Sequence, residues 1–133
     1  MPLKVTLKPK ERLFVNGAVM VNDDGNRINL LIVNDVPILR EKDILNEITA
    51  DTPCKKIYLT IQLMYMDPDS RIEYQKKYWK LVGEVVRAAP STTSLFHKIS
   101  EQILYGEYYK ALKIGQKLIQ YEKELVNVGK KPL

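Results

Sequence analysis

The sequence holds very few of the residues that build redox centres, metal sites and proton shuttles. Its 133 residues include one cysteine, Cys54, and one histidine, His97. A single cysteine excludes an internal disulfide and any site with several cysteine ligands, and it favours a reducing compartment such as the cytoplasm. One histidine leaves little for acid–base catalysis near neutral pH. We therefore expect a cytoplasmic protein with no metal, no cofactor and no enzymatic activity.

Long apolar runs and nucleotide-binding loops are missing as well. No stretch approaches the roughly 20 apolar residues that cross a bilayer, and the N-terminus lacks the basic-then-apolar pattern of a signal peptide. We expect neither a membrane-spanning segment nor export by that route. The phosphate-holding patterns GxxxxGK(S/T) and GxGxxG do not occur, which disfavours nucleotide hydrolysis and dinucleotide redox chemistry.

The composition that remains is that of a globular protein with an uneven distribution of charge. Hydrophobic residues make up 45% and charged residues 28% of the chain, enough for a packed core. The net charge is +5, yet residues 1–50 hold seven basic and seven acidic residues, so the whole excess lies downstream. Apolar residues alternate in the first part and recur every three or four positions in the second. We predict an α+β fold, with an antiparallel β unit at residues 1–50 and a unit of three to four helices at residues 51–133.

Short strands and tight turns alternate through the predicted β unit. Residues 3–7 alternate apolar and polar side chains, and residues 13–15 and 18–21 flank Asn16-Gly17, the dipeptide that favours a two-residue hairpin turn. Residues 28–32 form another strand pattern. Pro37 limits residues 36–39 to a short edge strand, because proline cannot donate to a β ladder. The pattern predicts a meander of four or five strands.

Helix signals begin at Thr52-Pro53, an N-cap followed by a proline in the first turn. Asp67-Pro68 interrupts the helical pattern, and further helices are predicted at residues 70–87, 95–105 and 107–128. The last helix carries an apolar stripe that includes Gly115, where a neighbouring element can approach closely. Its opposite side carries Lys110, Lys113, Lys117 and Tyr121.

Two small groups of residues could in principle carry chemistry. Cys54 and His97 would form a nucleophile and a base if the fold brought them together, but no orienting acid or oxyanion hole is evident, so an unreactive thiol is the favoured interpretation. Asp67 and Asp69 could hold a magnesium ion. The pattern DPDS is better explained as a turn that precedes a helix.

Four separated segments of the chain are distinctive as strings of residues: MPLKVTLKPKERLFVNGAVMVN at 1–22, ILREKDIL at 38–45, TPCKKIYLTIQLMYMDP at 52–68 and EYYKALKIGQKLIQYE at 107–122. Together they resemble the FlbT family, the flagellin post-transcriptional regulators of alphaproteobacteria. The resemblance implies a protein that acts on the 5′ untranslated leader of flagellin mRNA, lowering its translation and lifetime, although some members promote flagellin synthesis. It also implies a functional partnership with the flagellin-assembly regulator FlaF.

A shorter resemblance points to individual residues. The order of strands and turns followed by Leu39-Arg40-Glu41-Lys42-Asp43-Ile44 is similar to the carbon storage regulator family, whose last strand ends in an RNA-contacting arginine. Arg40 is accordingly the leading candidate for RNA contact, and an ion pair of Arg40 with Asp43 or Glu41 is the alternative. Phosphate and base contacts in RNA call for cations and aromatic rings. The full predicted RNA-binding set is Arg12, Arg27, Arg40, Lys42, Lys110, Lys113 and Lys117, with a plain solvated face as the alternative for the three lysines.

A protein-interaction adaptor or chaperone-like regulator is the rival hypothesis. Such a protein would bind flagellin or FlaF through tyrosine- and methionine-rich helices and touch RNA only indirectly. The sequence also leaves a homodimer open. The predicted interface anchors are Met64, Tyr65, Met66, Tyr108 and Tyr109.

Overall fold

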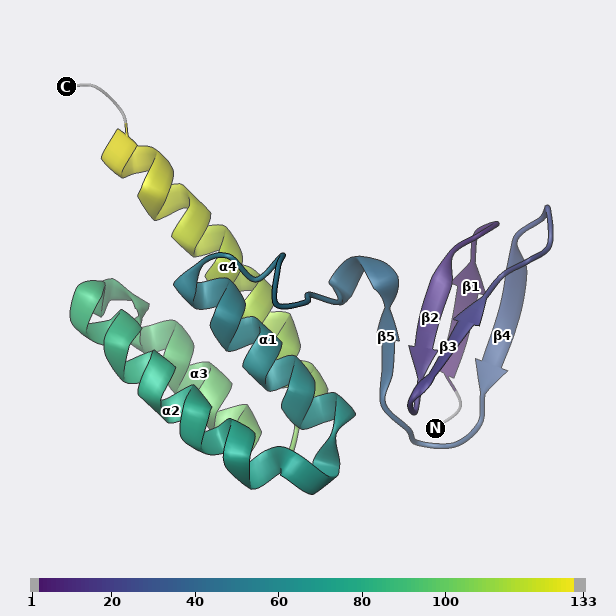
Figure 1. The fold of residues 1–133 in the computed structure, drawn as a ribbon, viewed down its shortest axis with the longest axis horizontal. Coiled ribbons are helices and arrows are strands. Elements are labelled where there is room, and N and C mark those ends of the chain that lie inside the picture. Colours follow the sequence, from purple (N-terminus) through teal and green to yellow (C-terminus); the bar gives the residue numbers. More distant parts are fainter. Residues whose placement is uncertain (1–2, 131–133) are drawn as a thin grey trace. The chain divides into compact units, whose positions relative to one another are not determined.

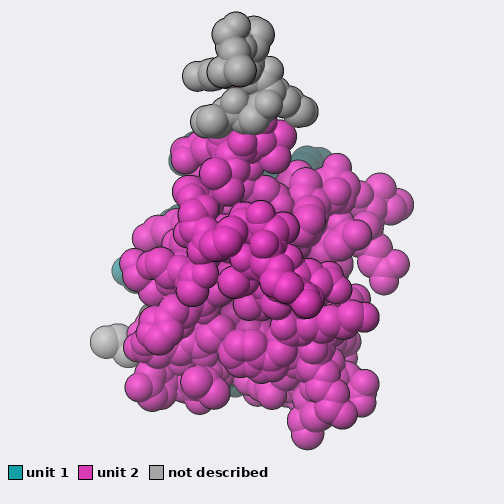
Figure 2. All heavy atoms as spheres, turned by 90° about the vertical axis from the view of Figure 1, so that its left-hand side faces the viewer, with its two compact units in different colours: residues 1–44 teal, residues 45–133 magenta. Residues whose placement is uncertain are grey.

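The chain forms two compact units in a computed structural model that describes the backbone of residues 3–130 and the side chains up to residue 127 (Figure 1). We call residues 1–44 the β unit and residues 45–133 the helical unit, and Figure 2 colours them separately. Strands fill the first and four helices the second, so the predicted α+β class is confirmed.

The β unit contains two small antiparallel sheets rather than one meander. Among the strands that the structure describes, one consecutive pair, β2 and β3, forms a hairpin, and its turn is the expected one, with Asn16 at φ 45° and Gly17 at φ 92°. The first sheet has the order β1-β4 and the second the order β3-β2-β5. The strands are β1 (Leu3–Leu7), β2 (Arg12–Val15), β3 (Ala18–Val21), β4 (Ile28–Ile32) and β5 (Ile38–Arg40).

Alternating apolar residues explain why two sheets form. Val5 and Leu7 of β1 and Leu13 of β2 are buried together, and partly buried residues of β2, β4 and β5 pack around them. A single sheet of this size would leave one apolar face in water, whereas two facing sheets enclose it. The buried Asn22 amide closes one end, because it donates to the carbonyls of Leu7 at 3.1 Å and Asn26 at 2.9 Å.

The helical unit follows the predicted helices closely. Thr52 caps the first helix by accepting the N–H of Lys55 at 3.2 Å, and Pro53 occupies its first turn. The elements are α1 (Pro53–Met66), α2 (Arg71–Ala88), α3 (Thr93–Leu104) and α4 (Tyr108–Lys130), with short 3-10 turns η1 (Glu41–Asp43), η2 (Pro68–Ser70) and η3 (Pro90–Thr92). Each predicted helix is confirmed, and Pro53, Pro68 and Pro90 each lie in a first turn, where the missing N–H costs nothing.

The core of the helical unit lies between α1 and its neighbours. Helix α1 packs against both α2 and α4, and α3 packs against α4 (Figure 1). Ile57, Ile61, Tyr78 and Ile99 are fully buried there. Tyr78 satisfies its buried hydroxyl with Ser100 Oγ of α3 at 2.8 Å. No helix in the described range is both long enough and apolar enough to cross a membrane.

Residues 45–50 belong with the helices. The backbone N–H of Leu45 donates to Oε1 of Gln62 at 2.9 Å, and Nε2 of Gln62 donates back to the Leu45 carbonyl at 2.9 Å. Gln62 is itself buried in α1. This pair of bonds ties the connecting segment to α1, so the two units divide between Ile44 and Leu45, whereas the sequence pattern changed at residue 50.

Candidate nucleic-acid interface

Arg40, the leading candidate from the sequence, points between the two sheets of the β unit. It pairs with Leu13 in the β2–β5 ladder, and Leu13 is a core residue. Its Nη1 donates to the Thr6 carbonyl of β1 at 3.1 Å and lies 3.4 Å from the Glu11 carboxylate. Its ion-pair partner is thus Glu11. Arg40 therefore joins one sheet to the other.

The carboxylate of Glu11 is held in its charged form by two neighbours. The backbone N–H of Lys8 donates to Glu11 Oε1 at 3.0 Å, and the guanidinium of Arg40 lies on its other side. The Lys8 bond first, and the Arg40 charge after it, hold the pKa of Glu11 below its usual value of 4.5, although partial burial acts in the opposite direction.

The other basic residues of the β unit differ in how much of their charge is free. Arg12 lies on the opposite face from Arg40 and forms an exposed pair with Glu41, Nε to Oε2 at 3.4 Å. Arg27 and Lys42 are exposed, and neither makes a hydrogen bond or ion pair with a residue that the structure describes. Free cations can neutralise phosphates without breaking a bond of the fold. Arg27 and Lys42 are therefore the better placed of the four for such contacts.

The three lysines of α4 form an exposed row, as the helical spacing predicts. The side chains of Lys110 and Lys117 make no hydrogen bond or ion pair within the described part of the chain. Lys113 Nζ lies 5.2 Å from the centre of the Tyr109 ring. Tyr109, 45% exposed, also contacts Tyr65 of α1, with the ring centres 6.0 Å apart. A half-exposed ring beside cations can receive an unpaired base.

Tyr121 lies on the lysine side of α4, as the sequence predicts, but its side chain is not free. Its hydroxyl donates to Ser91 Oγ of η3 at 2.7 Å, so it fastens α4 to the turn between α2 and α3. The aromatic ring that accompanies the lysines is Tyr109, which the sequence had assigned to a protein interface. Lys110, Lys113, Lys117 and Tyr109 together form what we call the α4 patch.

Two of the five predicted protein-interface anchors belong to the core. Met64 is fully buried and Tyr108 is 9% exposed. The Arg71 guanidinium lies 4.2 Å from the Tyr108 ring centre, and its Nε donates to the Met64 carbonyl at 2.7 Å. Met64 of α1 and Tyr108 of α4 therefore both contact Arg71 of α2, and the three residues hold these helices together. Tyr65 and Met66 are partly exposed and, with Tyr109, are the anchors that a partner could reach.

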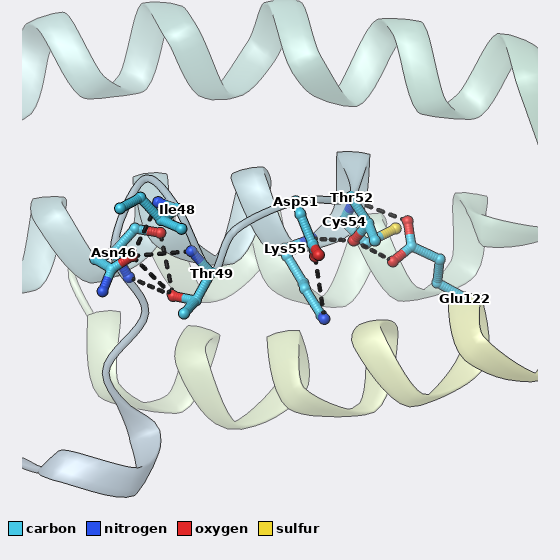
Figure 3. A network of polar contacts seen from close by, with 8 residues as sticks. All are labelled: Asn46, Ile48, Thr49, Asp51, Thr52, Cys54, Lys55 and Glu122. Carbon is cyan, nitrogen blue, oxygen red and sulfur yellow. Dashed lines mark hydrogen bonds and ion pairs between the residues drawn. The ribbon is translucent and has the colours of Figure 1, made fainter.

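Cys54 and His97 do not form a catalytic pair. Cys54 is buried at the start of α1, whereas the His97 side chain is 81% exposed on α3, 3.9 Å from Glu101. Around Cys54, the Glu122 carboxylate of α4 accepts the Thr52 hydroxyl at 2.5 Å and the Cys54 backbone N–H at 3.0 Å (Figure 3). Burial and this carboxylate raise the pKa of the Cys54 thiol to about 12. The thiol is protonated at neutral pH and is a poor nucleophile.

One exposed surface was missed by sequence reasoning. Trp79 and Ile72 are among the apolar residues that fit the helical pattern of α2, yet Trp79 is 49% exposed and Ile72 is 70% exposed. Tyr78, the residue before Trp79, is buried instead. The centres of the Tyr78 and Trp79 rings lie 5.1 Å apart in an edge-to-face arrangement. The available signal was the three lysines that surround Trp79 in the sequence, at positions 76, 77 and 80.

The fold and these surfaces define an α+β protein of two small units whose exposed chemistry is cationic and aromatic. No cluster of three metal-ligating side chains occurs among the residues described. Residues 3–126 match the family model described as "Flagellar protein FlbT". The chain belongs to the FlbT family, as its sequence predicted.

Relatives of known name extend over nearly the full chain. A protein of Bradyrhizobium diazoefficiens named "Probable flagellum biosynthesis repressor protein FlbT 1" is 46% identical over 125 residues, covering 94% of this chain and 85% of the relative. A Rhodopseudomonas palustris protein, also a "Probable flagellum biosynthesis repressor protein FlbT", is 45% identical, covering 96% and 99%. The "Flagellum biosynthesis repressor protein FlbT" of Caulobacter vibrioides is 36% identical, covering 93% and 89%. These names denote repressors and no enzyme. No solved structure matches the chain.

Proposed function

We propose that this protein is a cytoplasmic, non-enzymatic repressor that binds the 5′ untranslated leader of flagellin mRNA and lowers its translation and stability. Membership of the FlbT family and the repressor names of its relatives support the biological role. The observation that carries the RNA contact is the α4 patch, where free cations accompany a half-exposed tyrosine ring. Occlusion of the leader near the ribosome-binding site would be the mechanism.

The surroundings of each basic residue set its role in this proposal. Lys110, Lys113 and Lys117 would neutralise phosphates along α4, while Tyr109 stacks on an unpaired base. Arg27 and Lys42 would add phosphate contacts from the β unit. Arg12 and Arg40, which already have carboxylate partners, would act mainly by holding the β unit in shape.

Binding of a fluorescent flagellin leader at several salt concentrations tests the proposal. We expect saturable binding whose logarithmic salt slope falls by about 0.7–0.9 for each phosphate contact removed. Lys110→Gln with Lys117→Gln should therefore reduce the slope by about 1.4–1.8. Lys123→Gln, an exposed lysine on another side of α4, is the matched control and should leave the slope unchanged. Arg40→Ala is a poor probe, because it also removes the bond between the sheets.

Absence of saturable binding at low salt would contradict direct RNA recognition. The adaptor hypothesis would then explain the family role, with FlaF or flagellin as the partner. The exposed Tyr65–Tyr109 pair favours that hypothesis over the buried anchors. Capture of purified flagellin or FlaF in the absence of RNA, lost in Tyr109→Ser, would support it.

A further inference from the structure

Helix α2 carries an apolar stripe that none of the described residues of the helical unit covers. Ile72 is 70% exposed, Trp79 is 49% exposed and Val86 is partly exposed. The three residues are seven positions apart, which places them on one face of a helix. Tyr78 and Val85, which lie roughly 100–120° round the helix from Trp79, are buried in the core. The stripe is therefore a second apolar face of α2, in addition to the face that packs in the core.

A glycine interrupts α2 on this same face. Gly83 lies four residues after Trp79, and a Cβ placed there would meet nothing within 4 Å. Glycine inside a helix costs roughly 1 kcal/mol relative to alanine, and no contact in the structure requires it. By contrast, a Cβ on Gly115 would lie 3.1 Å from the Tyr58 ring. Gly83 leaves an open gap beside Trp79, of the kind that lets a second helix backbone approach closely.

Cations line one edge of the stripe. Lys76 and Lys80 are exposed, and neither ammonium group has an ion pair or hydrogen bond with a residue that the structure describes. Arg87 follows on the same edge, and its Nε donates to the Gly83 carbonyl at 3.2 Å, so its charge stays next to the gap. The glutamates of α2, Glu73 and Glu84, lie further round the helix. The stripe is thus complementary in charge to an acidic surface.

We infer that the outer face of α2 is a docking site for an acidic amphipathic helix of another protein. The apolar residues of that helix would cover Ile72, Trp79 and Val86, its backbone would approach at Gly83, and its carboxylates would pair with Lys76 and Lys80. This site is distinct from the α4 patch and does not depend on the RNA-binding proposal.

Two other occupants fit the stripe less well. A second copy of this chain would bring the same cations together, which costs free energy. An RNA base could stack on Trp79, but base stacking would not explain why Ile72 is exposed or why residue 83 is a glycine. A helix accounts for the apolar spacing, the glycine and the charges together.

Trp79 is the sole tryptophan of the chain, so its fluorescence reports directly on this site. The probe is a synthetic helix of about 20 residues, with leucines at heptad spacing and glutamates beside them. The matched control carries lysines in place of the glutamates. We expect the acidic peptide to shift Trp79 emission saturably to shorter wavelength and to bind at least about tenfold more tightly than the basic one.

Substitutions on α2 separate recognition from folding. Lys76→Glu with Lys80→Glu should reverse the preference, so that the basic peptide binds more tightly. Gly83→Leu should weaken binding about tenfold or more while preserving helical circular dichroism, because the gap has room for a side chain and leucine favours a helix. Lys77→Glu is the control, since position 77 lies about 160° round α2 from Trp79.

Three results would overturn the inference. The first is an unchanged Trp79 emission with the acidic peptide up to about 1 mM, or equal binding of both peptides. The second is saturable quenching of Trp79 by a single-stranded RNA oligonucleotide that Lys76→Glu with Lys80→Glu abolishes, which would make the stripe an RNA site. The third is an emission shift that depends on protein concentration alone, which would show a second copy on the stripe. Loss of leader binding in the Lys110→Gln, Lys117→Gln variant leaves these results unaffected, so the two proposals fail independently.

Discussion

At the scale of single residues, two helical glycines have opposite surroundings. Gly83 faces open space, so Gly83→Ala should raise the free energy of unfolding by about 0.5–1 kcal/mol through helix propensity. Gly115→Ala gains the same propensity but places its methyl 3.1 Å from the buried Tyr58 ring. Overpacking strain of about 1–3 kcal/mol should outweigh that gain. Denaturant unfolding of both variants measures the difference.

The two substitutions are chemically identical, so each controls for the other. Equal stabilisation by both would contradict the close contact between Gly115 and Tyr58. The sequence predicted a close approach at Gly115 from its place in the apolar stripe of α4. It could not identify Tyr58 as the neighbour, because that depends on how α1 packs against α4.

At the scale of secondary-structure elements, one arginine and one glutamate join the two sheets of the β unit. Arg40 reaches from β5 to the Thr6 carbonyl of β1 and to Glu11, just before β2. Because the pKa of Glu11 is lower in the folded protein than its usual 4.5, its charge stabilises the fold at neutral pH. That contribution is fully present above the unfolded-state pKa and is lost as the pH falls through the folded-state pKa.

Glu11→Gln tests this link, since glutamine still accepts the Lys8 N–H and removes only the charge. We expect the variant to unfold at a lower temperature than the wild type at pH 7, and the gap to close as the pH falls well below 4.5. Glu47→Gln is the control, because Glu47 is exposed and has no hydrogen bond or ion pair with a described residue. A gap of constant size at every pH would show that the carboxylate charge contributes nothing.

Among the elements, helix limits were readable from the sequence and strand pairing was not. Thr52-Pro53, Asp67-Pro68 and Pro90 act on the backbone within one turn, so they mark helix ends locally. The Asn16-Gly17 hairpin is equally local. The pairing of β1 with β4 joins residues about 25 positions apart in the sequence. Many pairings of five short strands are compatible with the same alternation of apolar and polar residues. Burial of Leu13 between the two sheets selects the observed pairing.

At the scale of the whole molecule, the two units differ in their capacity to fold alone. The helical unit has about 90 residues and a core built by four helices, whereas the β unit is near the size of about 40 residues below which a single core is marginal. We expect residues 45–133 alone to show helical circular dichroism and cooperative unfolding. Residues 1–44 alone should show neither ordered strands nor a cooperative transition. Cooperative unfolding of the 1–44 fragment would contradict this size argument.

The candidate surfaces follow the same division between local and non-local causes. Exposure of Lys110, Lys113 and Lys117 follows from helical spacing, which the sequence displays. Exposure of Trp79 does not, because Trp79 lies at the margin of an apolar stripe, where a rotation of a few tens of degrees exchanges core for surface. Only the neighbouring helices decide which ring, Tyr78 or Trp79, enters the core.

The sequence by itself determined the α+β class, the helix ends, the hairpin and the family, because these depend on local backbone preferences and on contiguous strings of residues. The tertiary structure decided which charges are free. The sequence displays Arg40 and Lys110 alike as cations, but the fold places Glu11 beside Arg40 and leaves Lys110 in solvent. An ion pair forms between groups that the folded backbone brings within a few ångströms of each other. The sequence alone does not determine that distance.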